Sequence, residues 1–176
     1  MGVEREKKVS FLDVFYPNEM IDSTYDISFE EWKKKGYQGV IFDIDNTLVP
    51  HGADADERSL ALFAKLKELG FQTMLLSNNK EARVKRFNEK IGSGYIYKAG
   101  KPGIRNYQKA MEFMGTKAEN TLFVGDQLFT DVWGAKRVGI YSILVKPIHP
   151  KEEIQIVLKR YLEKIVLYFY LKKKSK

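Results

Sequence analysis

Short apolar runs alternate along the chain with longer segments in which apolar residues recur at helical spacing. The run GVIFDI at residues 39–44 is almost continuously apolar, which is typical of a strand covered on both faces. The same criterion predicts further strands. Together the expected strands cover residues 39–44, 71–78, 94–99, 120–126 and 140–145.

The segments between these runs are amphipathic. Residues 54–70 predict a helix with acidic residues in its first turn, with Leu60, Phe63, Ala64 and Leu66 on its apolar side and with Gly70 at its C-terminal end. Pro102 stands where another helix begins, a position that tolerates proline. Further helices are expected over residues 80–92, 102–115 and 129–139.

Strand–helix alternation at this spacing predicts an α/β fold of three layers, in which helices cover both faces of a mostly parallel central sheet. The chain has 176 residues, which suits a single domain. Residues 151–176 are expected to form a C-terminal helix that ends in a basic tail.

Composition limits the possible functions. The chain has no cysteine, which excludes disulfides, zinc–thiolate sites and cysteine nucleophiles. The sequence shows neither a signal-peptide pattern nor an apolar stretch of the roughly 20 residues that cross a bilayer, so we expect a cytoplasmic protein. The net charge of +7 indicates an anionic partner, which could be nucleic acid, a phosphorylated substrate or a lipid headgroup.

Polar side chains follow the expected strands at the points where these end. In a parallel sheet the carboxyl ends of the strands meet at one edge, and ligands bind there. The residues expected to converge at this edge are Asp43, Asp45, Thr47, Ser77, Asn78, Lys101, Asp126 and Asp131.

Carboxylates without histidine or cysteine suit a hard cation such as Mg²⁺, which binds carboxylate and phosphate oxygens. A bound cation would also relieve the repulsion between Asp43 and Asp45, which are two residues apart. One carboxylate can then attack phosphorus, and the other can transfer the proton of the leaving group. Lysine and hydroxyl donors would hold the phosphoryl oxygens.

Four motifs in this order, DIDNT at residues 43–47, LLSNN at 75–79, GKP at 100–102 and GDQLFTD at 125–131, resemble the haloacid dehalogenase superfamily of aspartate-nucleophile phosphatases. The superfamily resemblance implies a Rossmann-like fold. The longer segments VIFDIDNTLVP and VGDQLFTDVWGAKRVGIYSILV resemble the bacterial YqeG-type phosphatases of subfamily IIIA, which are relatives of mitochondrial phosphatidylglycerophosphate phosphatases. The resemblance extends upstream through YPNEMIDSTYDIS at residues 16–28, so it implies that residues 1–37 are an N-terminal extension packed on the core. One departure is Lys136–Arg137, where the resemblance leads us to expect an asparagine before the basic residue.

The resemblance implies a role for each carboxylate. Asp43 would be the nucleophile and a metal ligand, and Asp45 the general acid and base, with its main-chain carbonyl on the metal. Asp126 would be an acidic metal ligand. Asp131 would bind the metal, directly or through water, or orient Lys101.

The resemblance also implies that Ser77 and Lys101 bind the phosphoryl group; Lys98 is the alternative lysine. Asn78 and Thr47 are further candidates for phosphate binding, although Thr47 could simply cap a turn. His51 and His149 both lie in loops beside proline, where we expect them to be exposed and not catalytic. The alternative for His51 is contact with a substrate, because it closely follows the first motif.

Members of the superfamily often carry a cap domain inserted between these motifs. Residues 47–77 and 77–101 leave no room for one here, so we expect a capless, open site. An open site suits a bulky substrate, such as a lipid or a macromolecule. The resemblance makes phosphatidylglycerophosphate a candidate.

Two other functions remain open at this point: a scaffold that binds phosphate or nucleic acid with little turnover, and a phosphatase of nucleic-acid ends. Nucleic acid is the less favoured partner because no aromatic residues are interleaved with the basic ones. The C-terminal segment could be a final helix that covers the sheet. It could also contact an anionic membrane peripherally through Lys172, Lys173, Lys174 and Lys176. The sequence does not determine the oligomeric state.

Overall fold

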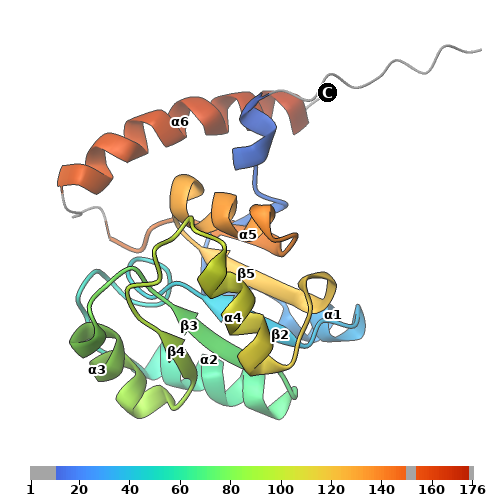
Figure 1. Ribbon diagram of the computed structural model, residues 1–176, viewed down its shortest axis with the longest axis vertical. Helices are drawn as coiled ribbons and strands as arrows, with labels where there is room; N and C mark the ends of the chain where they lie inside the picture. Colours follow the sequence, from blue (N-terminus) through green and yellow to red (C-terminus); the bar gives the residue numbers. More distant parts are fainter. Residues whose placement is uncertain (1–10, 150–153, 175–176) are drawn as a thin grey trace, which may run out of the picture.

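The computed structural model describes residues 11–149 and 154–174 (Figure 1). Parallel strands form one open six-stranded sheet in the order β1-β6-β5-β2-β3-β4. This order confirms the predicted α/β fold with a parallel central sheet. The strands are β1 (Glu19–Ile21), β2 (Gly39–Phe42), β3 (Gln72–Leu76), β4 (Gly94–Ile96), β5 (Thr121–Gly125) and β6 (Tyr141–Val145).

Helices cover both faces of the sheet, as expected. Side chains alternate along β2, so Val40 and Phe42 pack in one core and Ile41 packs in the other. The first core is covered by α1 (Phe29–Lys34), α2 (Glu57–Glu68) and α3 (Glu81–Ile91). The second core is covered by α4 (Arg105–Met114) and α5 (Trp133–Arg137).

Local signals set the helix ends. Asp56 caps α2. Its carboxylate accepts a hydrogen bond from the Ser59 amide at 2.8 Å, and the Asp56 amide donates one to the Ser59 hydroxyl at 2.9 Å. Because Asp56 is the cap, α2 begins later than the expected residue 54. Its buried apolar side includes Leu62, whereas Ala64, which we placed there, is exposed.

The segments between the motifs hold no inserted cap. Residues 47–77 contain α2 and β3, and residues 77–101 contain α3 and β4, together with their connecting loops. The capless prediction is therefore confirmed. The consequence is that the carboxyl edge of the sheet is not covered by a second domain within these two segments.

Two elements were not predicted, and one was predicted too simply. Strand β1 pairs in parallel with β6, and α1 buries Phe29 and Trp32, so the described part of the N-terminal segment packs on the core; residues 1–10 lie outside the described ranges. The expected helix at 129–139 is a π-helical turn, η4 (Leu128–Val132), that leads into α5. Such turns often occur at functional sites.

The last helix, α6 (Ile154–Lys174), does not cover a face of the sheet. It crosses the upper end of the molecule in Figure 1, where Val166 and Tyr170 pack on η4 and on the short 3₁₀ helix η1 (Phe11–Phe15). Residues 151–153, 175 and 176 of the expected C-terminal segment, including Lys176, lie outside the described ranges. None of the described helices is long and apolar enough to cross a membrane.

Candidate active site

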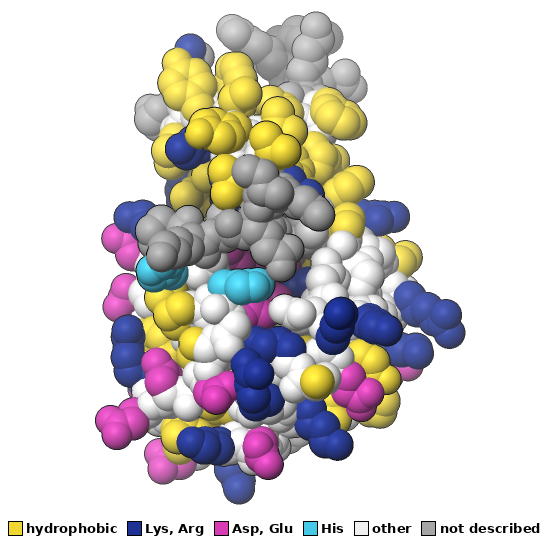
Figure 2. Space-filling model, turned by 90° about the vertical axis from the view of Figure 1, so that its left-hand side faces the viewer, with side chains coloured by type: hydrophobic (Ala, Val, Ile, Leu, Met, Phe, Trp, Pro, Cys, Tyr) yellow, Lys and Arg dark blue, Asp and Glu magenta, His cyan; other side chains and the backbone are white. Residues whose placement is uncertain are grey.

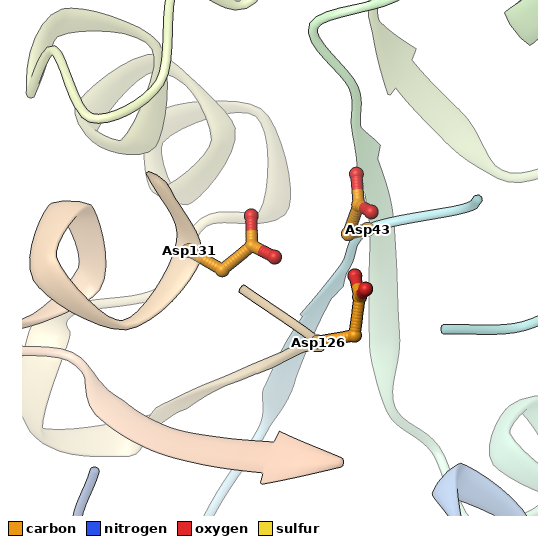
Figure 3. Close-up of side chains that lie close together, drawn as sticks. All are labelled: Asp43, Asp126 and Asp131. Atoms are coloured by element: carbon orange, nitrogen blue, oxygen red, sulfur yellow. The ribbon is translucent and has the colours of Figure 1, made fainter. Parts of the chain in front are cut away.

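Three carboxylates meet at the carboxyl edge of the sheet. Asp43 directly follows β2, Asp126 directly follows β5, and Asp131 lies on η4 (Figure 3). One carboxylate oxygen of each lies within 4.8 Å of those of the other two, and all three residues are buried. Oxygen ligands at such spacing, without histidine or cysteine, fit a hard metal ion.

Lys101 lies against two of these carboxylates. Its Nζ donates to Asp43 Oδ1 at 2.6 Å and to Asp131 Oδ1 at 2.7 Å, and its side chain is only 3% exposed. Asn78 holds the main chain of this lysine in place: Asn78 Oδ1 accepts from the Lys101 amide at 2.8 Å, and Asn78 Nδ2 donates to the Lys101 carbonyl at 3.2 Å. Lys101 is therefore held both at its main chain, by Asn78, and at its ammonium group, by the two carboxylates.

Burial and mutual repulsion determine the charge state of this cluster. The pKa of Asp43 is raised to about 7, because burial, together with the nearby Asp131, outweighs the opposing effect of Lys101. The pKa of Asp126 is raised well above its usual value by burial and by Asp131 and Asp43. Burial lowers the pKa of Lys101, but Asp131 and Asp43 outweigh that effect and raise it. A divalent cation would offset the repulsion that these shifts reflect.

Asp45 lies on the same edge, but its carboxylate is not part of the three-carboxylate group. Its Oδ1 accepts from Arg83 Nη2 at 3.0 Å and from the Gly52 amide at 2.7 Å. Its Oδ2 accepts from Asn79 Nδ2 at 3.1 Å. The Asp45 carboxylate is thus oriented separately from the acids that could hold a metal.

A cavity of about 200 Å³ opens beside Asp43 and Lys101. It brings both aspartates of the DIDNT motif together with the residues that follow β3. The lining residues are Asp43, Asp45, His51, Ser77, Asn78, Asn79, Lys101, Gln127 and Thr130. This volume can accept a phosphoryl group and the part of a substrate next to it.

Thr47 does not line this cavity, although we expected it to bind phosphate. Its hydroxyl is buried and donates to Asp126 Oδ1 at 3.1 Å. Lys98, the alternative to Lys101, is exposed and also lies outside the cavity lining. Ser77 does line the cavity, and its Oγ accepts from the Asn79 amide at 3.2 Å.

Helix α6 supplies contacts that the sequence did not indicate. Arg160 forms an ion pair with the Asp126 carboxylate, and its Nη1 donates to the Asp126 carbonyl at 2.5 Å. Glu163 accepts from the Leu128 amide at 2.7 Å and pairs with Arg160 at 2.9 Å. Arg83 is a further residue without a motif signal; it reaches Asp45 from α3.

The departure at Lys136 does not reach the candidate site. Lys136 Nζ donates to the main-chain carbonyls of Asp13 at 2.9 Å and Tyr16 at 2.7 Å. The side chain at this position therefore connects α5 with the N-terminal segment.

Position 125, the last residue of β5, requires glycine because the Asp131 side chain lies close to the main chain there. A Cβ added there would lie 2.6 Å from the carboxyl carbon of Asp131. We expect Gly125→Ala to displace Asp131 from Lys101 and to destabilise the fold by about 1–3 kcal/mol. If the site has the phosphomonoester hydrolysis that the resemblance implies, this activity should fall at least about tenfold. Steady-state kinetics and urea unfolding would measure the two effects.

Gly94→Ala is the matched control. Its Cβ would meet the flexible end of Met74, far along the sheet at β4, so activity should stay near that of the unchanged protein. Equal loss of activity in both variants would show that the Gly125 effect is one of general stability.

Comparison with known proteins decides the family. A model of haloacid dehalogenase-like hydrolases matches residues 53–139. The protein named "Probable phosphatase YqeG" of Bacillus subtilis is 37% identical over 154 residues, which cover 87% of this chain and 90% of that protein. The chain belongs to the haloacid dehalogenase-like hydrolases. It is a phosphatase of this family, and its substrate is therefore phosphorylated.

A more distant relative and a solved structure are also similar to the chain. Phosphatidylglycerophosphate phosphatase 1 (chloroplastic/mitochondrial) of Arabidopsis thaliana is 28% identical, over 86% of this chain and 47% of that protein. Among solved structures, the cobalt-bound deoxy-D-mannose-octulosonate 8-phosphate phosphatase of Haemophilus influenzae superposes with a TM-score of 0.52. It is 17% identical and covers 64% of this chain and 70% of that one, so it supports the Rossmann-like fold of the haloacid dehalogenase family.

Proposed function

We propose that the protein is a Mg²⁺-dependent phosphomonoesterase that works through a phospho-Asp43 intermediate. The observation that carries this proposal is the pairing of the buried Asp43 with Lys101 inside a carboxylate cluster that fits a metal ion. Aspartate is a known covalent nucleophile toward phosphorus. Phosphoryl transfer depends mainly on positioning and electrostatic stabilisation, which such a cluster can supply.

Asp43, Asp126 and Asp131 would hold the ion, with the main-chain carbonyl of Asp45 as a further ligand. Their oxygen donors and mutual repulsion fit Mg²⁺, which is commonly bound through one or two carboxylates and substrate phosphate oxygens. When bound, the ion would withdraw charge from the phosphoryl oxygens. Thr47 would keep Asp126 oriented through the hydrogen bond between them.

In the first half-reaction, a carboxylate oxygen of Asp43 attacks phosphorus, and the bond from phosphorus to the ester oxygen breaks. Asp45, which lines the same cavity, gives its proton to the departing oxygen. Lys101 and Ser77 hold the phosphoryl oxygens as charge develops on them. Asn78 contributes indirectly, because it holds the main chain of Lys101.

In the second half-reaction, water attacks the phosphorus of phospho-Asp43, and Asp45 takes the proton of that water. The bond between phosphorus and the Asp43 oxygen breaks, which releases inorganic phosphate and restores the carboxylate. Asp45 thus ends each cycle protonated and ready for the next substrate. Arg83 and Asn79 position Asp45 for both transfers.

The proposed substrate is a phosphomonoester on a bulky group, with phosphatidylglycerophosphate as the leading candidate. Two findings support this choice: the absence of an inserted cap between the motifs, and the similarity to a phosphatidylglycerophosphate phosphatase. Peripheral contact with an anionic membrane would give access to such a lipid. The basic end of α6, at Lys172, Lys173 and Lys174, favours this contact.

Metal removal tests the reaction, and a substrate panel tests the specificity. We expect a chelator to lower hydrolysis of a generic phosphomonoester at least about a hundredfold, because the carboxylate cluster needs a cation, and excess Mg²⁺ to restore it. With Mg²⁺ present, phosphatidylglycerophosphate should be hydrolysed with a higher kcat/KM than nucleotides, phosphosugars or 5′-phosphorylated oligonucleotides.

The outcomes separate the reaction from the substrate. Full activity in chelator would contradict the metal-dependent mechanism. Metal-dependent activity with no preference for the lipid would leave the mechanism standing and reject the proposed substrate. Preference for the oligonucleotide would favour a phosphatase of nucleic-acid ends.

A further inference from the structure

Helix α6 exposes a continuous apolar face. Its large apolar side chains recur at spacings of three and four residues on the side turned away from the rest of the protein. The exposed residues, called here the outer face, are Leu158, Tyr161, Leu162, Ile165, Tyr168, Phe169 and Leu171. Figure 2 shows hydrophobic side chains gathered at the upper end of the molecule, where α6 lies in Figure 1. A patch of this kind marks an interaction surface.

The opposite side of α6 packs on the protein along a narrow stripe. Val166 and Tyr170 are buried there, and Tyr16 packs edge-on against Tyr170 with ring centroids 5.3 Å apart. The helix therefore packs on the protein through a different set of apolar residues, and the outer face is not needed for that packing. Phe11, which is 79% exposed on η1, adds to the apolar surface near the C-terminal part of α6.

Basic side chains accompany the outer face. Lys159, Lys164 and Lys172 are exposed on the same helix, and Lys164 lies over the Tyr161 ring at 5.4 Å from its centroid. Lys174 is also exposed, but it lies over the ring of the buried Tyr170, at 5.8 Å from its centroid. Apolar and aromatic residues with flanking lysines are typical of helices that lie in the surface of an anionic bilayer. Tyrosines are enriched at the boundary between lipid and water.

We propose that the outer face of α6 docks on an anionic lipid surface. The apolar side chains would enter the boundary between headgroups and acyl chains, and the lysines would contact the phosphates. A second copy of the chain is the less suitable occupant, because two such faces would bring their lysines together. Within the described residues of α6, the sole acidic side chain is Glu163, which is buried and so cannot pair with them across such an interface.

The inner side of α6 connects this docking surface with the candidate active site. Arg160 contacts Asp126, and Glu163 contacts the Leu128 amide at the start of η4. A bilayer bound to the outer face would thus be held one helix away from the residues that follow β5. This docking deepens the proposed lipid substrate, but it does not depend on the proposed chemistry, because binding can be measured without turnover.

Co-sedimentation with vesicles tests the proposal. The double substitution Ile165→Asp with Phe169→Asp places two charges on the outer face and should lower partitioning onto phosphatidylcholine vesicles with about 30% phosphatidylglycerol at least about tenfold. Lys172→Gln with Lys174→Gln should reduce the preference for these vesicles over pure phosphatidylcholine. Phe113→Asp is the matched control, since Phe113 is 76% exposed on α4, away from α6, and should change nothing.

Hydrolysis of a small water-soluble phosphomonoester should be unchanged in all these variants, which would show that they fold. Wild-type protein that ignores anionic vesicles, or an Ile165→Asp, Phe169→Asp variant that binds them as well as wild type, would overturn the proposal. The same holds if sedimentation velocity finds a wild-type dimer that the double substitution dissociates, without vesicle binding by either. Vesicle binding by a protein that hydrolyses no phosphomonoester would reject the proposed function and leave the docking standing.

Discussion

Asp43→Asn is expected to lower the hydrolysis of every phosphomonoester at least about a thousandfold. The amide keeps the shape of the side chain but cannot form the acyl phosphate. It also withdraws one of the three carboxylates that could hold the ion. Steady-state kinetics with saturating Mg²⁺ would measure the loss, and trapping of labelled phosphate on the wild-type protein alone would assign it to Asp43.

Asp26→Asn is a control with the same chemical change at an exposed aspartate, and it should retain full activity. Residual activity of Asp43→Asn within tenfold of wild type would contradict a covalent role for Asp43.

Asp43→Asn should also change how the stability of the fold depends on pH. The folded pKa of Asp43, about 7, lies above its ordinary value of 3.8, so the folded state binds this proton more tightly than the unfolded state. Without metal, this contribution to stability is present at low pH and is lost as the pH rises through that interval. Metal-free Asp43→Asn should therefore melt no lower than metal-free wild type at about pH 8, as thermal unfolding would show.

Much of the fold could be predicted because each central strand can be recognised from a short apolar run in its own sequence. The run at 39–44 is apolar on both faces, and it ends in the polar residues that define the site. Strand β1 gave no such signal: it has three half-buried residues, and it is a strand only because β6, far along the chain, pairs with it. Pairing between distant segments is not encoded in a short local pattern.

The sequence indicated which residues lie near the candidate site better than it indicated what their side chains contact. Being next to a strand end placed Asn78 and Thr47 near the cavity, but it did not specify where their side chains point. The structure directs Asn78 to the Lys101 main chain and Thr47 to Asp126. Arg160 lies 34 residues beyond Asp126 in a segment without a motif, so only the packing of α6 reveals their ion pair.

Lys101→Met is expected to have the second large effect, on activity and on stability together. Lys101 Nζ lies between Asp43 and Asp131, and all three side chains are buried. Removal of the ammonium group would leave two buried carboxylates without their cation, which lowers the free energy of unfolding. Loss of one partner from a buried ion pair costs about 3–5 kcal/mol. Loss of a donor to the developing phosphoryl charge costs about a hundredfold to a thousandfold in kcat.

Mg²⁺ should partly rescue the stability of Lys101→Met and not its activity. A divalent ion can offset the repulsion among Asp43, Asp126 and Asp131, but it cannot replace the ammonium group that would hold the phosphoryl oxygens. Urea unfolding with and without Mg²⁺, beside kinetics at saturating metal, separates the two roles. Lys98→Met is the matched control, because Lys98 is exposed three residues earlier and outside the cavity lining, so both measurements should match wild type. An active Lys101→Met protein that unfolds like wild type would assign Lys101 neither role.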